Sequence, residues 1–425
     1  NVNESLKEGG RTGSGGGGQA RLRSVLVIAE IAVALVLLTA SGLLLRSFEK
    51  MREVDPGYRP DHTLVAGYNL PRQRYNTQAS IDGFNQELMR RLEQQPGVTA
   101  AGLTSFLPAS GSNNASVFVA EGYVDQKGAD MDLATTIQVE GNYFQAMGIP
   151  LLRGRFFTPA DKAGSELVVI VNHKLADQYW HGQDPIGKRL RRGTQQTQTP
   201  WMTFVGVVDD VKEGSPDEAS KNQYYQPVEQ AVQSGGALAP ANMLAGNGGY
   251  IAVRTRLAPE LMENVLRTTV RDLDPQLPLD QLQTMEHAVS DSEAPRRFNT
   301  ALISAFAAVA VLLAILGIYS VIAFSVAMRV QEMAIRIALG SQRGEILRLV
   351  LMAGAKLAVV GCVLGLAGAA AASKLLSTFL FGVSPYDPLV LSVSAVGILL
   401  LALAASALPA RRAAHVDPNQ VLRAE

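Results

Sequence analysis

The chain has 425 residues, and its 38 basic and 38 acidic residues give a formal net charge of zero. This balance provides no electrostatic reason to expect nucleic acid or an acidic partner, so a nucleic-acid-binding protein is not expected. The single cysteine, Cys362, excludes a disulfide within the chain and a cysteine-based metal framework.

Residues 1–20 are predicted to be a linker. They contain the glycine-rich run RTGSGGGG at residues 11–18, and glycine-rich segments behave as flexible coils. The chain begins with Asn1 and not with methionine, so we expect it to be a piece of a longer product.

Four segments are long and apolar enough to cross a membrane, which takes about 20 helical residues. The first contains VLVIAEIAVALVLLTASGLLL and is assigned to residues 21–46. A cleaved signal peptide is the alternative for this segment, but the apolar run is long for a signal peptide and no clear processing site follows it. The other three predicted spans cover about residues 298–328, 349–372 and 388–408.

Basic residues near the ends of these spans predict that both termini lie in the cytoplasm. The short segment between the third and fourth spans carries only Lys374, so it is expected on the opposite side. Residues 47–297 would then lie outside the cytoplasm, in the periplasm. The basic residues on the predicted cytoplasmic side are Arg21, Arg23, Arg329, Arg336, Arg343, Arg348, Arg411 and Arg412.

Residues 47–297 are predicted to contain two strand–helix–strand units, one near each end. Apolar residues recur at helical spacing between runs that favour strands, and Pro-Gly or Pro marks helix boundaries. The predicted elements are a strand at 63–70, a helix at 79–97 and a strand at 98–106, then a strand at 250–255, a helix at 259–274 and a strand at 278–285.

These two units are expected to form one split α/β subdomain of about residues 60–107 and 247–292. Runs such as LVVIVN and TFVGVVDDV predict a β-rich subdomain of about residues 108–246 inserted between them. The predicted fold class is therefore an α-helical membrane protein with four transmembrane helices and a large extracytoplasmic α+β domain.

Residues 329–348, between the second and third spans, are predicted to form a charged cytoplasmic elbow. Glu332 and Arg336 have the i,i+4 spacing and the acid-first order of a favourable helical ion pair. A bent, rigid knuckle is expected, and a solvated connector between spans is the alternative.

The bend itself is predicted at Gly340 and Ser341. Glycine suits the position just after a helix, and serine suits the N-cap of the next one. Arg343 and Glu345 follow, and the acidic side chain lies near the new helix start, where the helix dipole favours it.

Two charged residues fall inside predicted spans, Glu30 in the first and Lys356 in the third. Charges in lipid are usually paired or functional, so one hypothesis is an ion pair between these two residues. Snorkelling of each side chain to the nearby cytoplasmic interface is the alternative.

The third span also carries Gly361, Gly365 and Gly368. Small residues at this spacing let membrane helices approach closely, which predicts a helix-packing face. The alternative is that glycine and alanine are common in membrane helices without a specific role.

No sequence pattern typical of a catalytic, cofactor or metal site stands out. Residues 182–189, GQDPIGKR, fit the spacing of a phosphate loop, but Arg189 stands where Ser or Thr would bind magnesium. His173 and His181 lie near acidic residues, and exposed histidines are the simpler interpretation. We predict a protein that is not an enzyme and has no catalytic, metal or cofactor residues.

Three parts of the sequence resemble the MacB/FtsX-type ABC transporter permeases. The elbow EMAIRIALGSQRGEIL at residues 332–347 resembles their signature, and PARRAAHVDPNQVLR at 409–423 resembles their closing motif. Residues 141–157 and 185–190 resemble their periplasmic core domain. The resemblance covers essentially residues 20–425.

The resemblance implies a multi-pass protein of the bacterial inner membrane with a periplasmic domain that contains a porter-like split subdomain. It implies that residues 298–425 form an FtsX-like permease domain whose elbow contacts a separate ABC-type ATPase. ATP would be bound by that subunit, so no cofactor is expected in this chain. Further implied partners are membrane lipid, a second permease half or second copy, and a periplasmic adaptor or outer-membrane protein.

The start of the chain resembles its own end. Residues 1–10 match residues 417–425 when Leu6-Lys7 is aligned with Leu422-Arg423. This similarity predicts that the chain is the C-terminal half of a duplicated orphan permease and that residues 1–20 link it to a preceding repeat.

The expected function is transmission of ATP-driven motion across the inner membrane to the periplasmic domain, for export or extrusion. A membrane-anchored periplasmic binding or sensing module that acts without an ATPase is the alternative. A membrane enzyme is a third class, but it would need polar residues that converge in the external domain.

Overall fold

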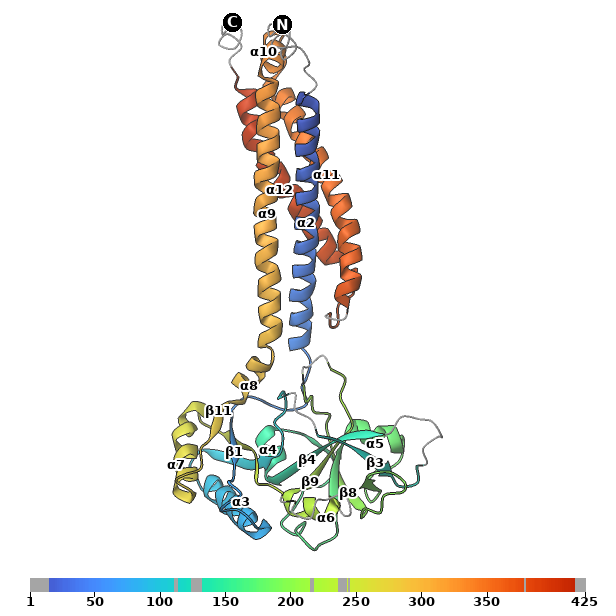
Figure 1. Cartoon of the computed structure of the whole chain (residues 1–425), viewed down its shortest axis with the longest axis vertical. Coiled ribbons are helices and arrows are strands. Elements are labelled where there is room, and N and C mark those ends of the chain that lie inside the picture. The colour runs from blue at the N-terminus through green and yellow to red at the C-terminus, as the bar shows by residue number, and fades with distance from the viewer. Residues whose placement is uncertain are drawn as a thin grey trace, which may run out of the picture. The chain divides into compact units, whose positions relative to one another are not determined.

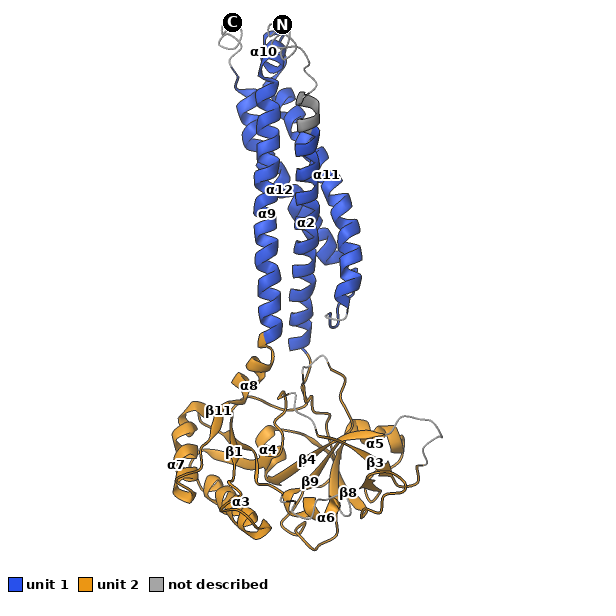
Figure 2. Ribbon diagram, viewed as in Figure 1, with its two compact units in different colours: residues 1–53, 295–425 blue, residues 54–294 orange. Residues whose placement is uncertain are grey.

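The computed structural model divides into two compact units (Figure 2), residues 1–53 with 295–425 and residues 54–294. We call them the helical unit and the sheet unit. The structure describes residues 15–110, 114–123, 132–214, 218–235, 243, 245–377 and 380–416, without the side chains of residues 15–20.

The helical unit contains long helices at all four predicted spans (Figure 1). Each helix extends beyond the predicted segment, because helical hydrogen bonding continues past the apolar core into the flanking polar residues. The helices are α2 (Gly15–Arg52), α9 (Ala294–Met328), α11 (Arg343–Leu376) and α12 (Pro388–Ala414), with the shorter α10 (Val330–Ala338) between α9 and α11.

The predicted linker of residues 1–20 is wrong in its last part, because α2 already begins at Gly15. Residues 1–14 and 417–425 lie outside the described residues, and so does the similarity between the two ends of the chain. Within the helical unit, the start of α2, the helix α10 and the end of α12 lie at one end, which we call the elbow end (Figure 1). The end of α2 and the start of α12 lie at the opposite end, which we call the domain end.

The sheet unit contains both predicted strand–helix–strand units. Their strands pair antiparallel in the order β11-β1-β10-β2, so segments far apart in sequence interleave within one sheet. The predicted helix at 259–274 starts with a 3-10 turn. The elements are β1 (Thr63–Asn69), α3 (Gln78–Glu93), β2 (Val98–Thr104), β10 (Gly248–Thr255), η4 (Pro259–Met262), α7 (Glu263–Leu273) and β11 (Asp280–Thr284).

Both faces of this sheet are covered. The helices α3 and α7 lie side by side on one face (Figure 1), where Leu64 and Ile251 pack against Leu88 and Leu266. On the other face, Ala252 belongs to a core formed with the short helices α4 (Tyr143–Met147) and α8 (Met285–Ser292). The alternation of side chains along each strand supplies both cores.

Helix α3 illustrates why the sequence prediction succeeded. Thr77 and Ser80 form a reciprocal capping box that satisfies two backbone N–H groups at the helix start. The apolar residues at helical spacing are all buried against the sheet: Ile81, Phe84, Leu88 and Leu92.

The inserted segment forms a closed ring of strands, which the sequence did not predict. The pairing runs β4-β3-β7-β8-β6-β9 and closes where β9 pairs parallel with β4 from Thr135↔Gln223 to Val139↔Pro227. The elements are β3 (Ala115–Ala120), β4 (Leu133–Gly141), β5 (Leu151–Gly154), β6 (Val168–Asn172), α5 (His173–Trp180), β7 (Arg189–Arg192), β8 (Met202–Val208), β9 (Gln223–Pro227), η2 (Val228–Gln230) and α6 (Ala231–Gly235).

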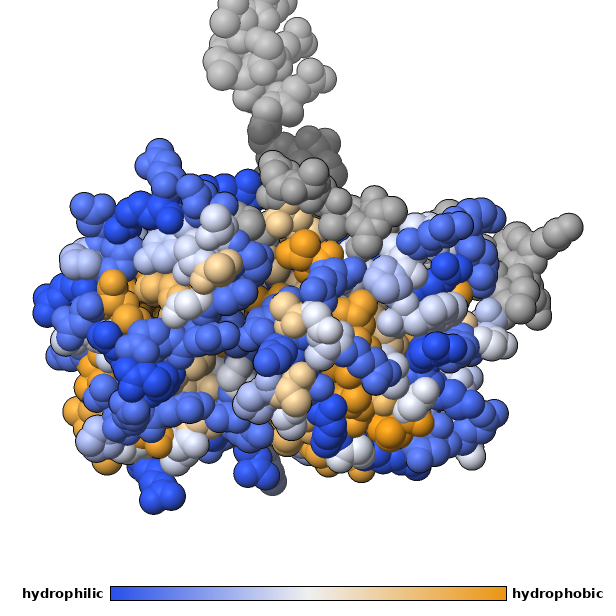
Figure 3. Space-filling view, turned by 90° about the horizontal axis from the view of Figure 1, so that it is seen from below, coloured by the Kyte–Doolittle hydropathy of each residue, from blue (hydrophilic) through white to orange (hydrophobic). Residues whose placement is uncertain are grey.

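Strand β4 belongs to both halves of the sheet unit. Its first residues pair with β3, and its last residues pair with β2, from Gly102↔Gly141 to Thr104↔Val139. The ring and the split sheet are therefore hydrogen-bonded into one continuous sheet. The face of this unit that Figure 3 shows is mainly hydrophilic with separate apolar areas, as expected of a domain in water.

We predict opposite stability effects for two glycine-to-alanine substitutions. A Cβ at Gly102 would overlap the backbone of Tyr143, so Gly102→Ala should lower the unfolding free energy by about 1–3 kcal/mol. Gly83 lies inside α3 with open space around it, so Gly83→Ala should raise it by about 0.5–1 kcal/mol.

Urea unfolding followed by tryptophan fluorescence measures both effects, because the chain's two tryptophans, Trp180 and Trp201, lie in the sheet unit. Gly83→Ala is the matched control for the added methyl group. Equal shifts of the urea midpoint in the two variants would contradict the packing argument.

Candidate coupling site

The elbow between α10 and α11 is a capped reversal of the chain. Gly340 has φ +99°, and its N–H donates to the Ile337 carbonyl at 3.0 Å. The N–H of Ser341 donates to the Arg336 carbonyl at 2.9 Å. These two bonds form a Schellman motif, which satisfies carbonyls at the end of α10. Glycine suits this position because its φ is in the left-handed region.

The prediction that Ser341 is the N-cap of α11 is wrong. The N-cap is Gln342, whose side chain makes no capping hydrogen bond. Because the backbone of Ser341 completes the cap of α10, α11 begins one residue later. Glu345 is then the third residue of α11, where the helix dipole favours a carboxylate.

Four of the predicted elbow residues line one small hollow of about 100 Å³: Glu332, Arg336, Ser341 and Glu345. Arg336 donates to Glu332 at 2.6 Å, and both side chains are about half exposed. Such a pair contributes only about 0.3–0.5 kcal/mol, so these charges suit recognition more than stability. Arg343 is also exposed but does not line the hollow.

The sequence analysis missed Leu339 as a site residue. This leucine lies at the tip of the elbow and is 83% exposed, next to the charged residues of the hollow. An exposed leucine is common at a surface, but one at a tight reversal beside polar groups suits a protein contact. The signal in the sequence was a large apolar residue directly before the predicted Gly340 bend.

The elbow is anchored in the core of the helical unit. Met333 on α10 and Ile346 on α11 are buried in the same cluster as Ala410 and Ala413 of α12. Both arms of the elbow are thus held by side chains in the core of the helical unit.

Helix α11 contacts α2 through the three predicted glycines. A Cβ at Gly361 would overlap Ile31, one at Gly365 would overlap Leu35, and one at Gly368 would press on Val36. The absence of side chains at these positions brings the two backbones together along several turns. On its other side, α11 approaches α12 at Gly354, where a Cβ would overlap Ser406.

The proposed ion pair between Glu30 and Lys356 is not formed. Glu30 Oε2 is buried and has no hydrogen-bond partner among the described residues, and Lys356 is exposed at the surface of the helical unit. The carboxylate lies against Gly317 of α9, where a Cβ would overlap it. Glu30 thus lies against α9 while Lys356 is exposed on α11, a difference that sequence depth alone does not reveal.

The domain end carries a clamp that the sequence analysis missed. Arg46 at the end of α2 donates to Asp387 at 2.5 Å, and Asp387 also accepts from Leu389 N–H at 3.0 Å as the N-cap of α12. Ser47 Oγ accepts from Phe381 N–H at 2.8 Å. Because 341 residues separate Arg46 from Asp387, no local pattern could have indicated the pair.

The other sequence candidates do not converge on a site. Residues 182–189 lead into strand β7 and not into a helix, so they lack the helix N-terminus of a phosphate loop. The basic residues Lys188, Arg189, Arg191 and Arg192 lie largely in β7, where Leu190 is buried. His181 Nδ1 lies 2.6 Å from Asp177 Oδ1, and no group of three metal-ligating side chains occurs within the described residues.

Comparison with known protein families shows which family the chain belongs to. The MacB-like periplasmic core domain matches residues 24–266, which is more than half of the chain, and the FtsX-like permease C-terminal domain matches residues 304–418. The chain belongs to the MacB/FtsX family of ABC transporter permeases. The predicted resemblance and fold class are confirmed, and the family is one of transporter permeases and not of catalytic enzymes.

Two related proteins are about one-quarter identical to this permease over the aligned residues. The macrolide export ATP-binding/permease protein MacB 2 of Aeromonas hydrophila is 25% identical over 292 residues, 68% of this chain and 43% of the relative. The pyoverdine export ATP-binding/permease protein PvdT of Pseudomonas aeruginosa is 27% identical over 285 residues, 65% of this chain and 40% of the relative. The permease therefore spans less than half the length of these relatives.

Among solved structures, the periplasmic region of MacB from Actinobacillus actinomycetemcomitans is similar to this permease. It is 15% identical with a TM-score of 0.36 and covers 57% of this chain and 98% of that structure. The extracellular domain of the transporter YknZ, from Gram-positive bacteria, covers 49% of this chain and 93% of that structure at 15% identity and a TM-score of 0.31.

We predict that Gly365→Leu disrupts the contact between α2 and α11. The added side chain would overlap Leu35, so the helical unit should lose about 1–3 kcal/mol of stability. The single cysteine, Cys362, is 5% exposed in α11, so its reaction with a fluorogenic maleimide during heating reports the opening of this unit.

Gly397→Leu on α12 is the control, because open space surrounds a Cβ at that position. The maleimide should react at a lower temperature in Gly365→Leu and at the unchanged temperature in Gly397→Leu. A similar shift in both variants would refute a specific contact at Gly365.

Proposed function

We propose that this permease transmits the ATP-driven motion of a partner ATPase to its extracytoplasmic domain. The observation that carries the proposal is the elbow: a backbone-capped reversal, anchored in the helical core, that presents an exposed leucine among charged side chains. This geometry suits a docking point that moves with a partner.

The first step would be binding of the ATPase at the elbow tip. Leu339 offers apolar area, while Arg336, Arg343 and Glu345 provide charges that orient a partner. ATP would be held by that partner, so no cofactor is proposed in this chain.

The second step would be transmission along α11. This helix has 34 residues and is about 51 Å long at 1.5 Å per residue, enough to cross the bilayer. The glycine face of α11 contacts α2. After α2 ends at Arg52, the chain continues into the sheet unit. The Arg46–Asp387 clamp joins the far ends of α2 and α12, so the helices would move as one body at the domain end.

The proposed orientation places both termini and the elbow in the cytoplasm and residues 47–297 in the periplasm. The basic residues at the elbow end of the helical unit support it, since positive residues favour the cytoplasmic side. The proposed location is the bacterial inner membrane, in contact with lipid.

The proposed output is export or extrusion, as in the names of the related macrolide and pyoverdine exporters. A second permease half or a second copy of this chain would complete the membrane assembly, and a periplasmic adaptor or outer-membrane protein would complete the path. The substrate class is not specified by the elbow or the helices.

We predict that Arg336→Glu combined with Arg343→Glu weakens ATPase binding. Reversal of two exposed charges at the proposed contact should weaken binding at least about tenfold, or about 1.4 kcal/mol. Leu339→Ala should weaken it through lost apolar contact without any change in charge. Co-purification of the permease with candidate ATPases in detergent measures the retained ATPase.

The control is Arg267→Glu combined with Arg271→Glu, the same charge change on exposed residues of α7. This variant should retain the ATPase fully. Full retention by the elbow variant would refute the proposal, and no ATPase retained by any form would favour a sensing module that acts without one.

We further predict that loss of the clamp uncouples motion while ATPase binding is preserved. Arg46→Ala or Asp387→Asn removes an ion pair worth roughly 0.5–1 kcal/mol, and asparagine still caps α12. The ATP-dependent change in Trp180 and Trp201 fluorescence should fall by about half or more, because α2 is no longer held at its domain end.

Lys50→Ala is the matched control, since it breaks an exposed ion pair between Lys50 of α2 and Glu53, which directly follows that helix. It should leave the fluorescence response intact. If the clamp variants respond to ATP as the native protein does, the clamp has no part in transmission.

A further inference from the structure

A cleft of about 570 Å³ opens in the sheet unit between α3 and the inserted ring. Its floor is the end of β4, and its walls are α3, the segment 157–162 and the β9–η2 junction. This volume is within the range of sites that hold small molecules. The apolar residues that line it include Met89, Val139, Phe157, Pro227 and Val228.

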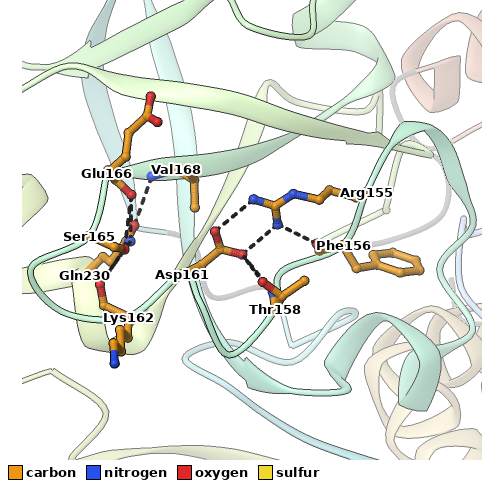
Figure 4. A network of polar contacts seen from close by, with 9 residues as sticks. All are labelled: Arg155, Phe156, Thr158, Asp161, Lys162, Ser165, Glu166, Val168 and Gln230. Carbon is orange, nitrogen blue, oxygen red and sulfur yellow. Dashed lines mark hydrogen bonds and ion pairs between the residues drawn. The ribbon is translucent and has the colours of Figure 1, made fainter.

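One wall of the cleft is fixed by buried hydrogen bonds (Figure 4). Asp161, which is 8% exposed, accepts from Arg155 at 2.7 and 2.9 Å and from Thr158 N–H at 2.7 Å. Burial raises the pKa of Asp161, but these hydrogen bonds outweigh it and hold the pKa below its usual value. Asp161 therefore stays charged and neutralises Arg155.

Gln230 holds the residues that directly follow the segment 157–162 (Figure 4). It is 1% exposed, and its amide donates to Ser165 Oγ and to the Glu166 carbonyl, both at 3.0 Å. Its Oε1 accepts from Val168 N–H at 2.9 Å. The wall is thus formed before any ligand arrives, which lowers the entropic cost of binding.

The floor of the cleft carries a carboxyl group, and one of its two oxygens lacks a hydrogen-bond partner in the described part of the chain. Glu140 Oε2 is buried and has no hydrogen-bond partner among the described residues. Burial is the main cause that raises the pKa of Glu140 to about 8; a hydrogen bond with Asn85 lowers this pKa, and the nearby carboxylates Asp82 and Glu229 add to the rise.

The acidic side chains of the cleft have few basic side chains beside them. Arg90 of α3 is held by Glu87 at 2.6 Å, and the hydrogen-bond donors to Glu229 are the neutral Gln86 amide and the Ala163 N–H. Glu93 likewise accepts from the Asn142 amide. Lys162 of the lining is exposed, and burial together with the nearby Glu140 raises the pKa of Tyr68 of β1.

We infer that this cleft binds an organic cation with an apolar body. The positive group would lie between Glu140 and Glu229, and the apolar body would contact Met89, Phe157 and Val228. An opposite charge in partly buried surroundings is stabilising, and the apolar lining accounts for the rest of the ligand. The site lies apart from the elbow, and binding requires no ATPase.

Binding should depend on pH in a defined direction. A cation prefers the ionised form of Glu140, which is a minor form below pH 8. Affinity should therefore rise as pH increases from 6 to 9, and it should be up to about tenfold weaker at pH 7 than at pH 9. Binding at pH 7 should release a proton.

The test uses the whole chain in lipid nanodiscs and equilibrium dialysis of tetraphenylphosphonium, with uptake by empty nanodiscs subtracted. Tetraphenylborate has the same shape and the opposite charge, so it is the matched ligand control. Saturable binding of the phosphonium that strengthens with pH, with weaker or no binding of the borate, is the expected result.

Variants locate the binding in the cleft. Glu140→Gln should weaken phosphonium binding at pH 9 at least about tenfold and remove most of the pH dependence. Glu229→Gln should weaken it with the pH dependence preserved. Glu260→Gln, an exposed acidic residue on η4, should have no effect. Equal phosphonium binding by Glu140→Gln and the native chain, or preference for the borate, would overturn the inference without any bearing on the coupling function.

Discussion

A chain that leaves a membrane and returns at once must satisfy its backbone polar groups at the turn. In this permease the left-handed Gly340 closes two hydrogen bonds onto α10 within a two-residue reversal. Because the backbone supplies both capping hydrogen bonds, no side chain of the elbow is needed to cap the end of α10. Leu339 and Arg343 can therefore face outward, while Met333 and Ile346 hold the elbow to the bundle core.

Close approach of backbones is the second constraint in the helical unit. Lipid tails are as apolar as leucine, so hydrophobicity alone does not pair helices in a membrane, and close packing must contribute. In α11, Gly361, Gly365 and Gly368 allow close packing against α2, and Gly354 allows it against α12. Helix α11 thus connects the elbow with both neighbours, and the Arg46–Asp387 clamp joins those neighbours at the other end.

In the sheet unit, a ring of strands is joined to a split α/β sheet. Strand β4 does this by pairing with β3 and β9 along most of its length and with β2 at its end. The same strand ends at the cleft, where Glu140 and Gly141 form the floor. The junction that unites the two subdomains is therefore also the place where a buried carboxyl meets a cavity.

The sequence by itself determined the spans, the elements of the split sheet and the elbow, because hydrophobic length, helical periodicity and turn residues are local signals. The run at 25–45, the apolar face of α3 and Gly340 are examples. Tertiary structure alone decided that Ser341 completes a C-cap, that Glu30 faces Gly317 and not Lys356, and that Arg46 meets Asp387. It also closed the ring through β4 and β9 and buried Glu140. These features depend on contacts between distant segments, and no local pattern encodes the register or the face on which such segments meet.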